Sequence, residues 1–196
     1  KMSIKYACCL LFSMFCLLPA SAFAKTIMIL GDSLSAGYGF NPQQGWVALL
    51  QQRLNQQFPG KHKVVNASVS GETTSGALAR LPKLLQTHRP DVVVIELGGN
   101  DGLRGQAPQM IQKNLAQLVQ ISQRSKAQVL LLGMKLPPNY GAAYNKAFEN
   151  NYQLISQQYK IKLLPFFMSG VAGHAKLMQK DQIHPNAAAQ PVLLNN

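Results

Sequence analysis

The strongest constraint on the fold is a regular alternation of short apolar runs with longer segments of helical periodicity. The segments between the runs place apolar residues three and four apart, as one face of a helix does. The run 92–95, Val-Val-Val-Ile, is apolar without alternation, which is typical of a strand buried on both faces. A repeated strand–helix pattern predicts a parallel sheet with helices on both faces. We therefore expect an α/β fold, a three-layer α/β/α sandwich around a central parallel sheet of about five strands.

Local signals set the bounds of these elements. Pro59-Gly60 ends the first long helical segment, and Pro108 suits the first turn of a later one. Pro82 lies inside a helical segment, where we expect a kink or a break. The last segment, 186–196, leaves room only for a short helix containing Pro191, which needs packing to be stable and to hold the preceding residues. The expected strands are 26–30, 64–67, 91–97, 128–132 and 162–164, and the expected helices are 46–58, 74–88, 108–124 and 142–159.

The first 24 residues carry the pattern of a secretory signal. Lys1 and Lys5 give a positive start, residues 7–18 are apolar except for Ser13, and Ala22-Phe23-Ala24 fits the small-x-small cleavage rule. The apolar stretch is too short for a spanning helix. We expect a signal peptide over 1–24, one folded domain over 25–196 and a periplasmic or secreted location. An uncleaved membrane anchor is the alternative.

Composition excludes several classes of protein. With 47% hydrophobic residues and no heptad or Gly-X-Y period, the chain is neither disordered nor fibrous. The net charge of +12 would suit an anionic partner, but the basic residues include no run of four. We expect no nucleic-acid partner and at most peripheral contact with membrane lipid. All three cysteines lie within 1–24, so we expect no thiol, disulfide or cysteine metal site in the folded domain.

Polar segments follow the predicted strands, where a parallel sheet places its functional sites. Gly-Asp-Ser-Leu-Ser at 31–35 follows the first strand, Ser-Gly-Glu-Thr at 70–73 the second, and Gly-Gly-Asn-Asp at 98–101 the third. A fourth segment, Asp-Gln-Ile-His-Pro-Asn at 181–186, comes late in the chain. Of the seven acidic residues, four lie in these segments: Asp32, Glu72, Asp101 and Asp181.

Together these segments supply the parts of a serine hydrolase. Asp181 and His184 are three residues apart, so one turn brings the carboxylate to one ring nitrogen and leaves the other for Ser33. A histidine activates a serine hydroxyl by taking its proton, and an acid fixes the tautomer of the histidine. The Ser33 N–H, the Gly71 N–H and the Asn100 amide then supply donors for the oxyanion. At Gly71 no side chain blocks the approach of substrate.

Other readings of the same residues are weaker. The chain has no Gly-x-Ser-x-Gly motif, phosphate-binding loop or dinucleotide fingerprint. A zinc site of His174, His184 and Asp181 is an alternative with few supporting ligands, so we expect neither a metal nor a cofactor. Glu96, in an apolar strand, is expected to be a hydrogen-bonded structural acid.

With these motifs the chain resembles the SGNH, or GDSL, hydrolase superfamily. The segment 31–35 is similar to its first block, Gly71 to the second, 98–101 to the third and 181–184 to the fifth. The resemblance covers essentially all of 25–191 and extends to the periplasmic thioesterase, lysophospholipase and protease group. The segments similar to that group are 97–105, 136–141, 164–168, 183–186 and 189–191.

The resemblance implies a flavodoxin-like fold, a triad of Ser33, His184 and Asp181, and no cofactor. It implies hydrolysis of small-molecule acyl esters, thioesters or lysophospholipids through an acyl-enzyme. A carbohydrate O-deacetylase and a non-catalytic acyl- or lipid-binding protein are the alternatives. We expect a monomer.

The acyl group is expected to bind near the polar segments. Gly102 and Leu103 begin a stretch with two glycines, which suits a mobile loop, and the apolar stretch after the fourth strand suits a wall of the pocket. The Phe-Phe-Met stretch at 166–168 is expected in the core. The predicted substrate-binding residues are Gly102, Leu103, Leu136, Pro137 and Tyr140.

Overall fold

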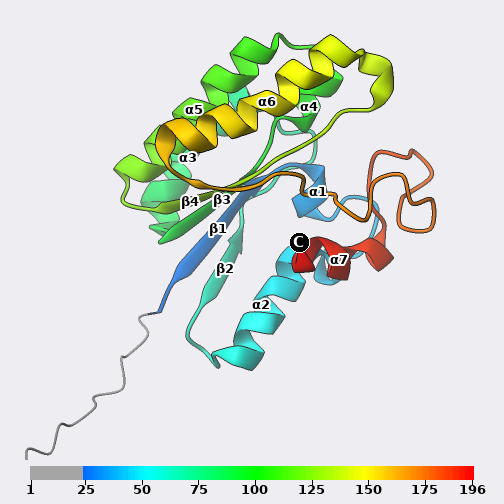
Figure 1. Cartoon of the computed structure of the whole chain (residues 1–196). Coiled ribbons are helices and arrows are strands. Elements are labelled where there is room, and N and C mark those ends of the chain that lie inside the picture. The colour runs from blue at the N-terminus through cyan, green and yellow to red at the C-terminus, as the bar shows by residue number, and fades with distance from the viewer. Residues whose placement is uncertain (1–23) are drawn as a thin grey trace, which may run out of the picture.

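The computed structural model describes residues 24–196 and shows a parallel sheet between two layers of helices (Figure 1). The predicted α/β/α sandwich is confirmed, and each predicted strand is found to within one residue at either end. The predicted signal peptide lies outside the described residues, except for Ala24. The strands are β1 (Thr26–Gly31), β2 (Lys63–Asn66), β3 (Val92–Glu96), β4 (Gln128–Leu132) and β5 (Lys162–Leu164).

The strand order is β2-β1-β3-β4-β5, and every neighbouring pair is parallel. The chain leaves β1 toward one edge of the sheet and returns through β3 toward the other, so the order reverses between these two strands. Open parallel sheets bind ligands outside the carboxyl ends of the strands at such a reversal. The segments after β1 and β3 are therefore the best placed for a functional site.

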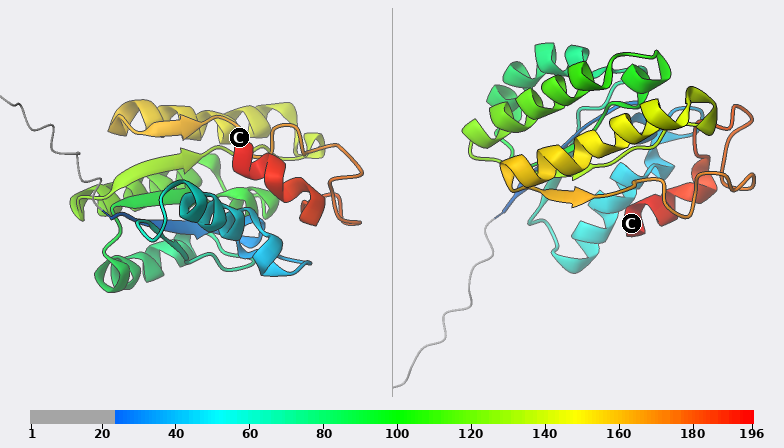
Figure 2. Two further views of the ribbon diagram at one scale, coloured as in Figure 1. Left: turned by 90° about the horizontal axis from the view of Figure 1, so that it is seen from below. Right: turned by 45° about the horizontal axis from the view of Figure 1, so that its top comes forward.

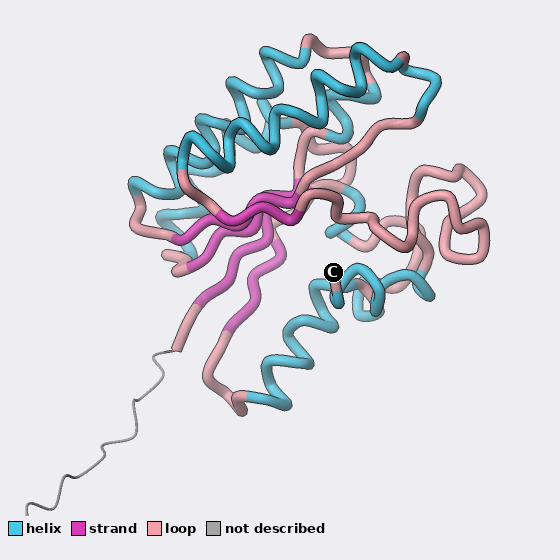
Figure 3. Tube along the Cα trace, viewed as in Figure 1, coloured by secondary structure: helices cyan, strands magenta, loops and turns pink. Residues whose placement is uncertain are grey.

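Helices cover both faces of the sheet (Figures 1, 2 and 3). One face carries α3 (Thr74–His88), α5 (Pro108–Arg124) and α6 (Ala142–Tyr159). The opposite face carries α2 (Trp46–Gln57) and α7 (Gln190–Asn195). No helix within residues 24–196 is both long and apolar enough to cross a membrane.

The helix α3 runs unbroken through Pro82. Of the two expected outcomes, a kink or a break, the break does not occur. A proline removes one backbone hydrogen bond from a helix. Pro82 lies on the exposed side, while Leu81 and Leu85 on the inner side are buried in the core. Burial of this apolar face holds the two halves of the helix together.

Two short helices that the sequence pattern did not predict follow β1 and β3. Helix α1 (Ser33–Ala36) begins where the Asp32 side chain accepts a hydrogen bond from the Leu34 N–H at 3.0 Å. Helix α4 (Gly99–Leu103) follows Gly98, whose φ of 106° lies in the left-handed region that glycine tolerates. Each is too short to show a helical period. Because α4 contains Gly102 and Leu103, the expectation that a loop begins at these two residues is wrong.

The C-terminal segment is packed against α2. The Trp46 N–H donates to the Gln190 side chain at 3.0 Å, and the Arg53 guanidinium donates to the Asn195 side chain at 2.6 Å. Leu193 is buried in the core. Pro191 lies in the first turn of α7, where a proline breaks no helical hydrogen bond. The packing that this short helix needs is therefore present.

Candidate active site

Ser33 lies where β1 meets α1, at the carboxyl end of a central strand. As the first residue of α1, its N–H group has no acceptor within that helix. Ser33 lines a cavity although it is only 8% exposed. The local turn therefore places at the cavity a serine whose backbone N–H is left without a partner in its own helix.

A chain of hydrogen bonds joins the three predicted catalytic residues. The Nε2 atom of His184 lies 2.9 Å from the Ser33 Oγ, and its Nδ1 lies 2.7 Å from the Asp181 Oδ2. The other oxygen of Asp181 accepts from the N–H groups of Ile183 and His184, each at 3.0 Å. This is the arrangement in which a carboxylate orients an imidazole toward a serine.

The Asp181 carboxylate stays charged at low pH. Burial of the carboxylate is the largest single effect on its pKa, and it acts to raise that pKa. Hydrogen bonds from the backbone and ring of His184 and from the Ile183 N–H outweigh that effect and lower the pKa of Asp181 to about 2. The carboxylate is therefore an anion at any pH at which His184 can act as a base.

His184 belongs to a long segment without regular helices that nonetheless holds its position. Its carbonyl oxygen accepts from the Gln179 N–H at 2.7 Å, and Met178 pairs with Pro185 in an antiparallel bridge. The Tyr38 ring lies 4.5 Å from the imidazole, centre to centre. The histidine is thus fixed by contacts with its own loop and with the segment after α1.

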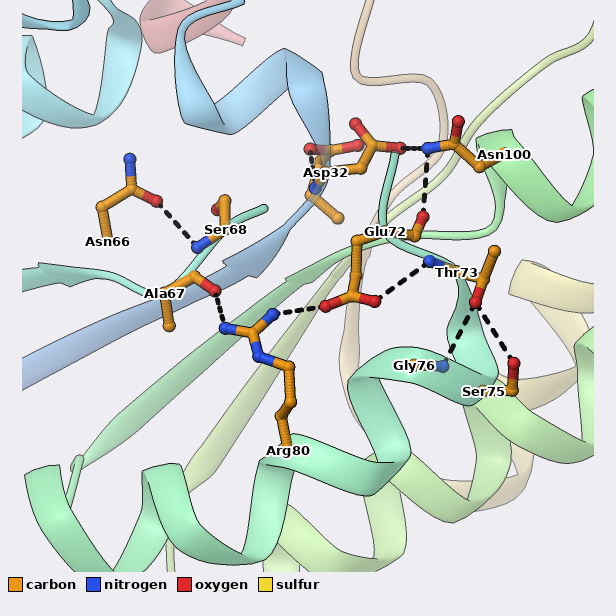
Figure 4. Close-up of polar contacts among 11 residues, drawn as sticks. Asp32, Asn66, Ala67, Ser68, Glu72, Thr73, Ser75, Gly76, Arg80 and Asn100 are labelled. Carbon is orange, nitrogen blue, oxygen red and sulfur yellow. Dashed lines mark hydrogen bonds and ion pairs between the residues drawn. The ribbon is translucent and has the colours of Figure 1, made fainter. Parts of the chain in front are cut away.

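Asn100, on α4, lines the same cavity as Ser33, but its amide is not free (Figure 4). Its Nδ2 atom donates to the Asp32 carboxylate and to the Glu72 carbonyl oxygen, each at 3.0 Å. Both N–H groups of the amide are therefore engaged, which the sequence did not predict. The two bonds fix where the amide lies.

Gly71 lies in the turn after β2 with a φ of 78°. A Cβ atom at this position would meet no atom within 4 Å, so a left-handed backbone, rather than the expected close approach, requires glycine here. Among the hydrogen bonds of residues 24–196, none has the Gly71 N–H as donor. Gly71 does not line the cavity, although Asn100 and Ser33 do.

Two buried carboxylates, those of Asp32 and Glu96, lie close to the start of α1. Glu96 is fully buried, and its Oε2 accepts from the Ser35 hydroxyl at 2.8 Å and from the Asp32 N–H at 3.3 Å, as expected of a structural acid. Burial raises the pKa of Glu96 well above its usual value, and the nearby Asp32 charge raises it further. Burial likewise raises the pKa of Asp32 to about 6, against the opposing hydrogen bond from Leu34 and the charge of His184.

A cavity of about 460 Å³ opens beside Ser33 and His184. Three of the predicted substrate-binding residues, Leu103, Leu136 and Pro137, line it. Most of the other lining side chains are apolar, as in a site for an acyl chain. Pro138 lies within the apolar stretch predicted as a wall, and those that the sequence did not predict include Leu34, Met134, Phe166, Met168, Ala172, Met178 and Ile183.

Gly102 and Tyr140 do not line the cavity, so their prediction as contact residues is corrected. A Cβ at Gly102 would lie within 2.9 Å of Leu136 and Phe148, which shows how closely the cavity wall packs on α4. The Tyr140 hydroxyl donates to the Leu103 carbonyl oxygen at 2.8 Å. Both residues therefore contact residues of the cavity wall without lining the cavity themselves.

The Phe-Phe-Met stretch was expected in the core, and this is right only in part. Phe167 is 1% exposed, and its ring lies 5.4 Å from that of Trp46. Met168 is also buried in the core, but it lines the cavity at the same time, as does the partly buried Phe166. Met134 comes two residues after the end of β4, so the rule that sites follow strands could have identified it.

The zinc alternative finds no support in the described part of the chain. Within residues 24–196, no three histidine, cysteine or acidic side chains are grouped so as to hold a metal ion. The hydrogen bonds of His184 to Ser33 and Asp181 engage both of its ring nitrogens.

Comparison with known proteins agrees with this geometry. The model of the GDSL-like lipase/acylhydrolase family matches residues 29–191. The chain is 53% identical over 180 residues to the esterase TesA of Pseudomonas aeruginosa, covering 92% of this chain and 89% of that protein. It is 47% identical over 173 residues to thioesterase 1/protease 1/lysophospholipase L1 of Escherichia coli K12, covering 88% and 81%.

Solved structures give the same result. A crystal structure of TesA superposes with a TM-score of 0.84 at 53% identity, covering 87% of this chain and 94% of that one. The psychrotrophic esterase EstA from Pseudoalteromonas, inhibited by monoethylphosphonate, also has a TM-score of 0.84, at 46% identity and with 87% and 93% covered. The resemblance inferred from the motifs is therefore confirmed. The chain belongs to the GDSL-like lipase/acylhydrolase family and is, like these relatives, an ester hydrolase.

Proposed function

We propose that the protein hydrolyses acyl esters and thioesters through an acyl-enzyme formed on Ser33. The observation that carries this is the hydrogen-bonded chain from Asp181 through His184 to the Ser33 hydroxyl, at the wall of an apolar cavity. Ser33 Oγ attacks the acyl carbonyl while His184 Nε2 takes the serine proton. Asp181 stabilises the imidazolium that results.

The tetrahedral intermediate that forms then breaks down as His184 gives up that proton. His184 donates it to the oxygen or sulfur of the leaving group, and the acyl group remains on Ser33. Water attacks the acyl-enzyme with His184 again as the base, and the acid product leaves with Ser33 restored.

The negative oxygen of each tetrahedral intermediate is bound by the N–H groups of Ser33 and Gly71 and by the Asn100 amide. Because Asp32 and Glu72 engage both amide N–H groups in the free protein, one of these bonds is shared or exchanged when the oxyanion forms. The Glu72 carbonyl keeps the amide in place, and we assign the N–H held by Asp32 to the oxyanion.

The cavity favours a chain of several carbons over an acetyl group. Its lining includes Leu103, Leu136, Phe166 and Met168, a larger apolar surface than acetate can cover. The carbohydrate deacetylase alternative is therefore the weaker one. Relatives named esterase, thioesterase and lysophospholipase suit the same class of substrate. We further propose a monomer that is exported by the signal at residues 1–24.

Purified wild type and Ser33→Ala, tested on p-nitrophenyl esters from acetyl to palmitoyl, check this function. We expect hydrolysis that depends on Ser33 and prefers medium or long acyl chains. A preference for acetate alone would favour a deacetylase. Equal and negligible rates in both folded proteins would support the non-catalytic binding protein instead. N-terminal sequencing of the exported protein locates the cleavage site.

A further inference from the structure

The loop after β2, residues 67–73, is tied at both ends to one guanidinium outside the cavity (Figure 4). Arg80 of α3 forms an ion pair through Nη1 with the Glu72 Oε2. Its Nη2 donates to the Ala67 carbonyl oxygen at 2.7 Å. The other oxygen of Glu72 accepts from the Thr73 N–H at 3.3 Å. Arg80 therefore fixes the first residue of this loop and its penultimate residue.

The same loop carries groups that belong to the proposed oxyanion hole. The Glu72 carbonyl oxygen accepts from the Asn100 amide at 3.0 Å, and Gly71 immediately precedes it. Neither Arg80 nor Glu72 lines the cavity, so neither touches a bound substrate. Any effect of the ion pair on the reaction passes through the loop backbone.

One backbone hydrogen bond joins this loop to β1, from the Val69 N–H to the Gly31 carbonyl oxygen at 3.1 Å. The Glu72 N–H donates to the Val69 carbonyl oxygen at 3.0 Å, and the exposed Arg104 reaches the Gly71 carbonyl oxygen only at 3.4 Å. The Glu72 side chain is 9% exposed, whereas that of Arg80 is 34% exposed. Burying a carboxylate without a cation beside it costs free energy, so the position of the Glu72 side chain depends on Arg80.

Helix α3 leaves room for this carboxylate. Gly76 lies in the first turn, and a Cβ atom there would collide with the Glu72 Oε1. Its φ is not in the left-handed region, so glycine is needed for space and not for backbone freedom. Gly76 and Arg80 are four residues apart and lie on the same face of α3, toward Glu72.

We propose that the Glu72–Arg80 ion pair is a positioning device for the oxyanion hole. It sets the direction of the Glu72 carbonyl and of the Gly71 N–H, and through the carbonyl it sets the Asn100 amide. This inference rests on the proposed function, because it requires that these donors bind an oxyanion. Donors that act on the charged oxygen stabilise the transition state more than the bound ester, so their displacement lowers kcat and leaves KM nearly unchanged.

The test measures kcat and KM on one p-nitrophenyl ester for wild type and four variants. We expect Arg80→Ala to lower kcat about 10- to 100-fold, less than the loss of a donor outright, with KM changed less than about twofold. Arg80→Lys keeps the charge and should recover part of the loss. Gly76→Ala displaces the carboxylate without changing any charge and should also lower kcat. Lys83→Ala, which removes an exposed charge from the same helix, is the matched control and should behave as wild type.

A double-mutant cycle separates positioning from general destabilisation. In the Asn100→Ala background, Arg80→Ala should lower kcat by less than about threefold, because the amide is absent and only the Gly71 N–H is left to be displaced. Equal fold losses in both backgrounds would overturn the proposal, and so would a wild-type kcat in Arg80→Ala. If Arg80→Ala fails to fold by circular dichroism, Arg80→Lys and Gly76→Ala go through the same cycle.

The outcomes also separate this proposal from the proposed function. If wild type shows no hydrolysis that depends on Ser33, the proposed function fails and the inference falls with it. If wild type is active and Asn100→Ala is impaired while Arg80→Ala, Arg80→Lys and Gly76→Ala are all normal, only the positioning role is wrong.

Discussion

The Nε2 atom of His184 lies 2.9 Å from the Oγ atom of Ser33, although 151 positions separate the two residues in the chain. Ser33 is placed by the end of a central strand, whereas His184 is placed by a loop close to the C-terminus. The site therefore forms only when the first and last parts of the described domain are brought together.

Replacing Asp181 by asparagine should lower kcat by roughly 10³- to 10⁴-fold, with KM little changed. An asparagine can present its amide N–H to His184 Nδ1, which favours the wrong tautomer and no longer stabilises the imidazolium. Steady-state kinetics on a p-nitrophenyl ester measures the loss. Full activity in Asp181→Asn would show that the carboxylate is not part of the machinery.

Asn100→Ala should lower kcat by roughly 100- to 1000-fold, as the loss of one oxyanion donor does in other hydrolases. The exposed Asn150 on α6 provides a control, and Asn150→Ala should retain the wild-type rate. An unchanged kcat in Asn100→Ala would mean that Asp32 and Glu72 hold this amide for a structural purpose only.

Leu103→Trp should shift the preference of the enzyme toward short acyl chains. Leu103 ends α4 and lines the cavity, so a larger side chain there removes space for distal carbons. We expect kcat/KM for a decanoyl ester to fall about tenfold or more, while kcat/KM for an acetyl ester changes little. The reason is that each methylene buried in the cavity contributes about 0.8 kcal/mol to binding, and the larger side chain excludes a few of them. Leu154→Trp, on the exposed side of α6, is the control. An equal loss for both esters would argue that the chain binds elsewhere.

The free energy of unfolding should fall as the pH rises from about 4 to about 6. Burial raises the pKa of Asp32 from its usual 3.8 to about 6, so in this range the folded protein keeps a proton that the unfolded chain releases. Stability is therefore greatest below the unfolded pKa and is lost as the pH rises through the folded one, by about 3 kcal/mol for this group alone. The raised pKa of Glu96 acts in the same direction.

Urea denaturation of wild type and Asp32→Asn at pH 4 and pH 7 measures this contribution. The asparagine keeps an oxygen for the Leu34 N–H and does not titrate, so the difference between the two proteins should grow with pH. The charges that face Asp32 are those of Glu96, His184 and Asp101, and they are the same in both proteins. Parallel pH profiles would show that Asp32 keeps an ordinary pKa.

The sequence predicted the strands because each is an apolar run bounded by polar turns, and it predicted the four long helices from their period. It could not predict α1 and α4, since four or five residues show no period and their start depends on caps such as Asp32. The residues of the triad were identified because Ser33 follows a predicted strand and because Asp181 and His184 are only three residues apart. Whether Phe166 or Phe167 faces the cavity depends on Trp46, a partner distant in the chain that no local pattern reveals.

Arg80 shows a second limit of the sequence. An arginine inside a helix is ordinary on an exposed face, and only the folded loop brings Glu72 and the Ala67 carbonyl within its reach. Likewise the Asn100 amide was expected as a free donor, and its bonds to Asp32 and Glu72 arise from tertiary contacts across three loops.

The position of His184 has a consequence for how the enzyme loses activity. The serine and the amide follow strands of the sheet, whereas the histidine and its acid belong to a segment tied down by a few loop hydrogen bonds and a short terminal helix. Segments of that kind open at a lower free energy than the sheet they cover. Heat inactivation should therefore precede the loss of helical signal, and the two melting curves should be separated by several degrees.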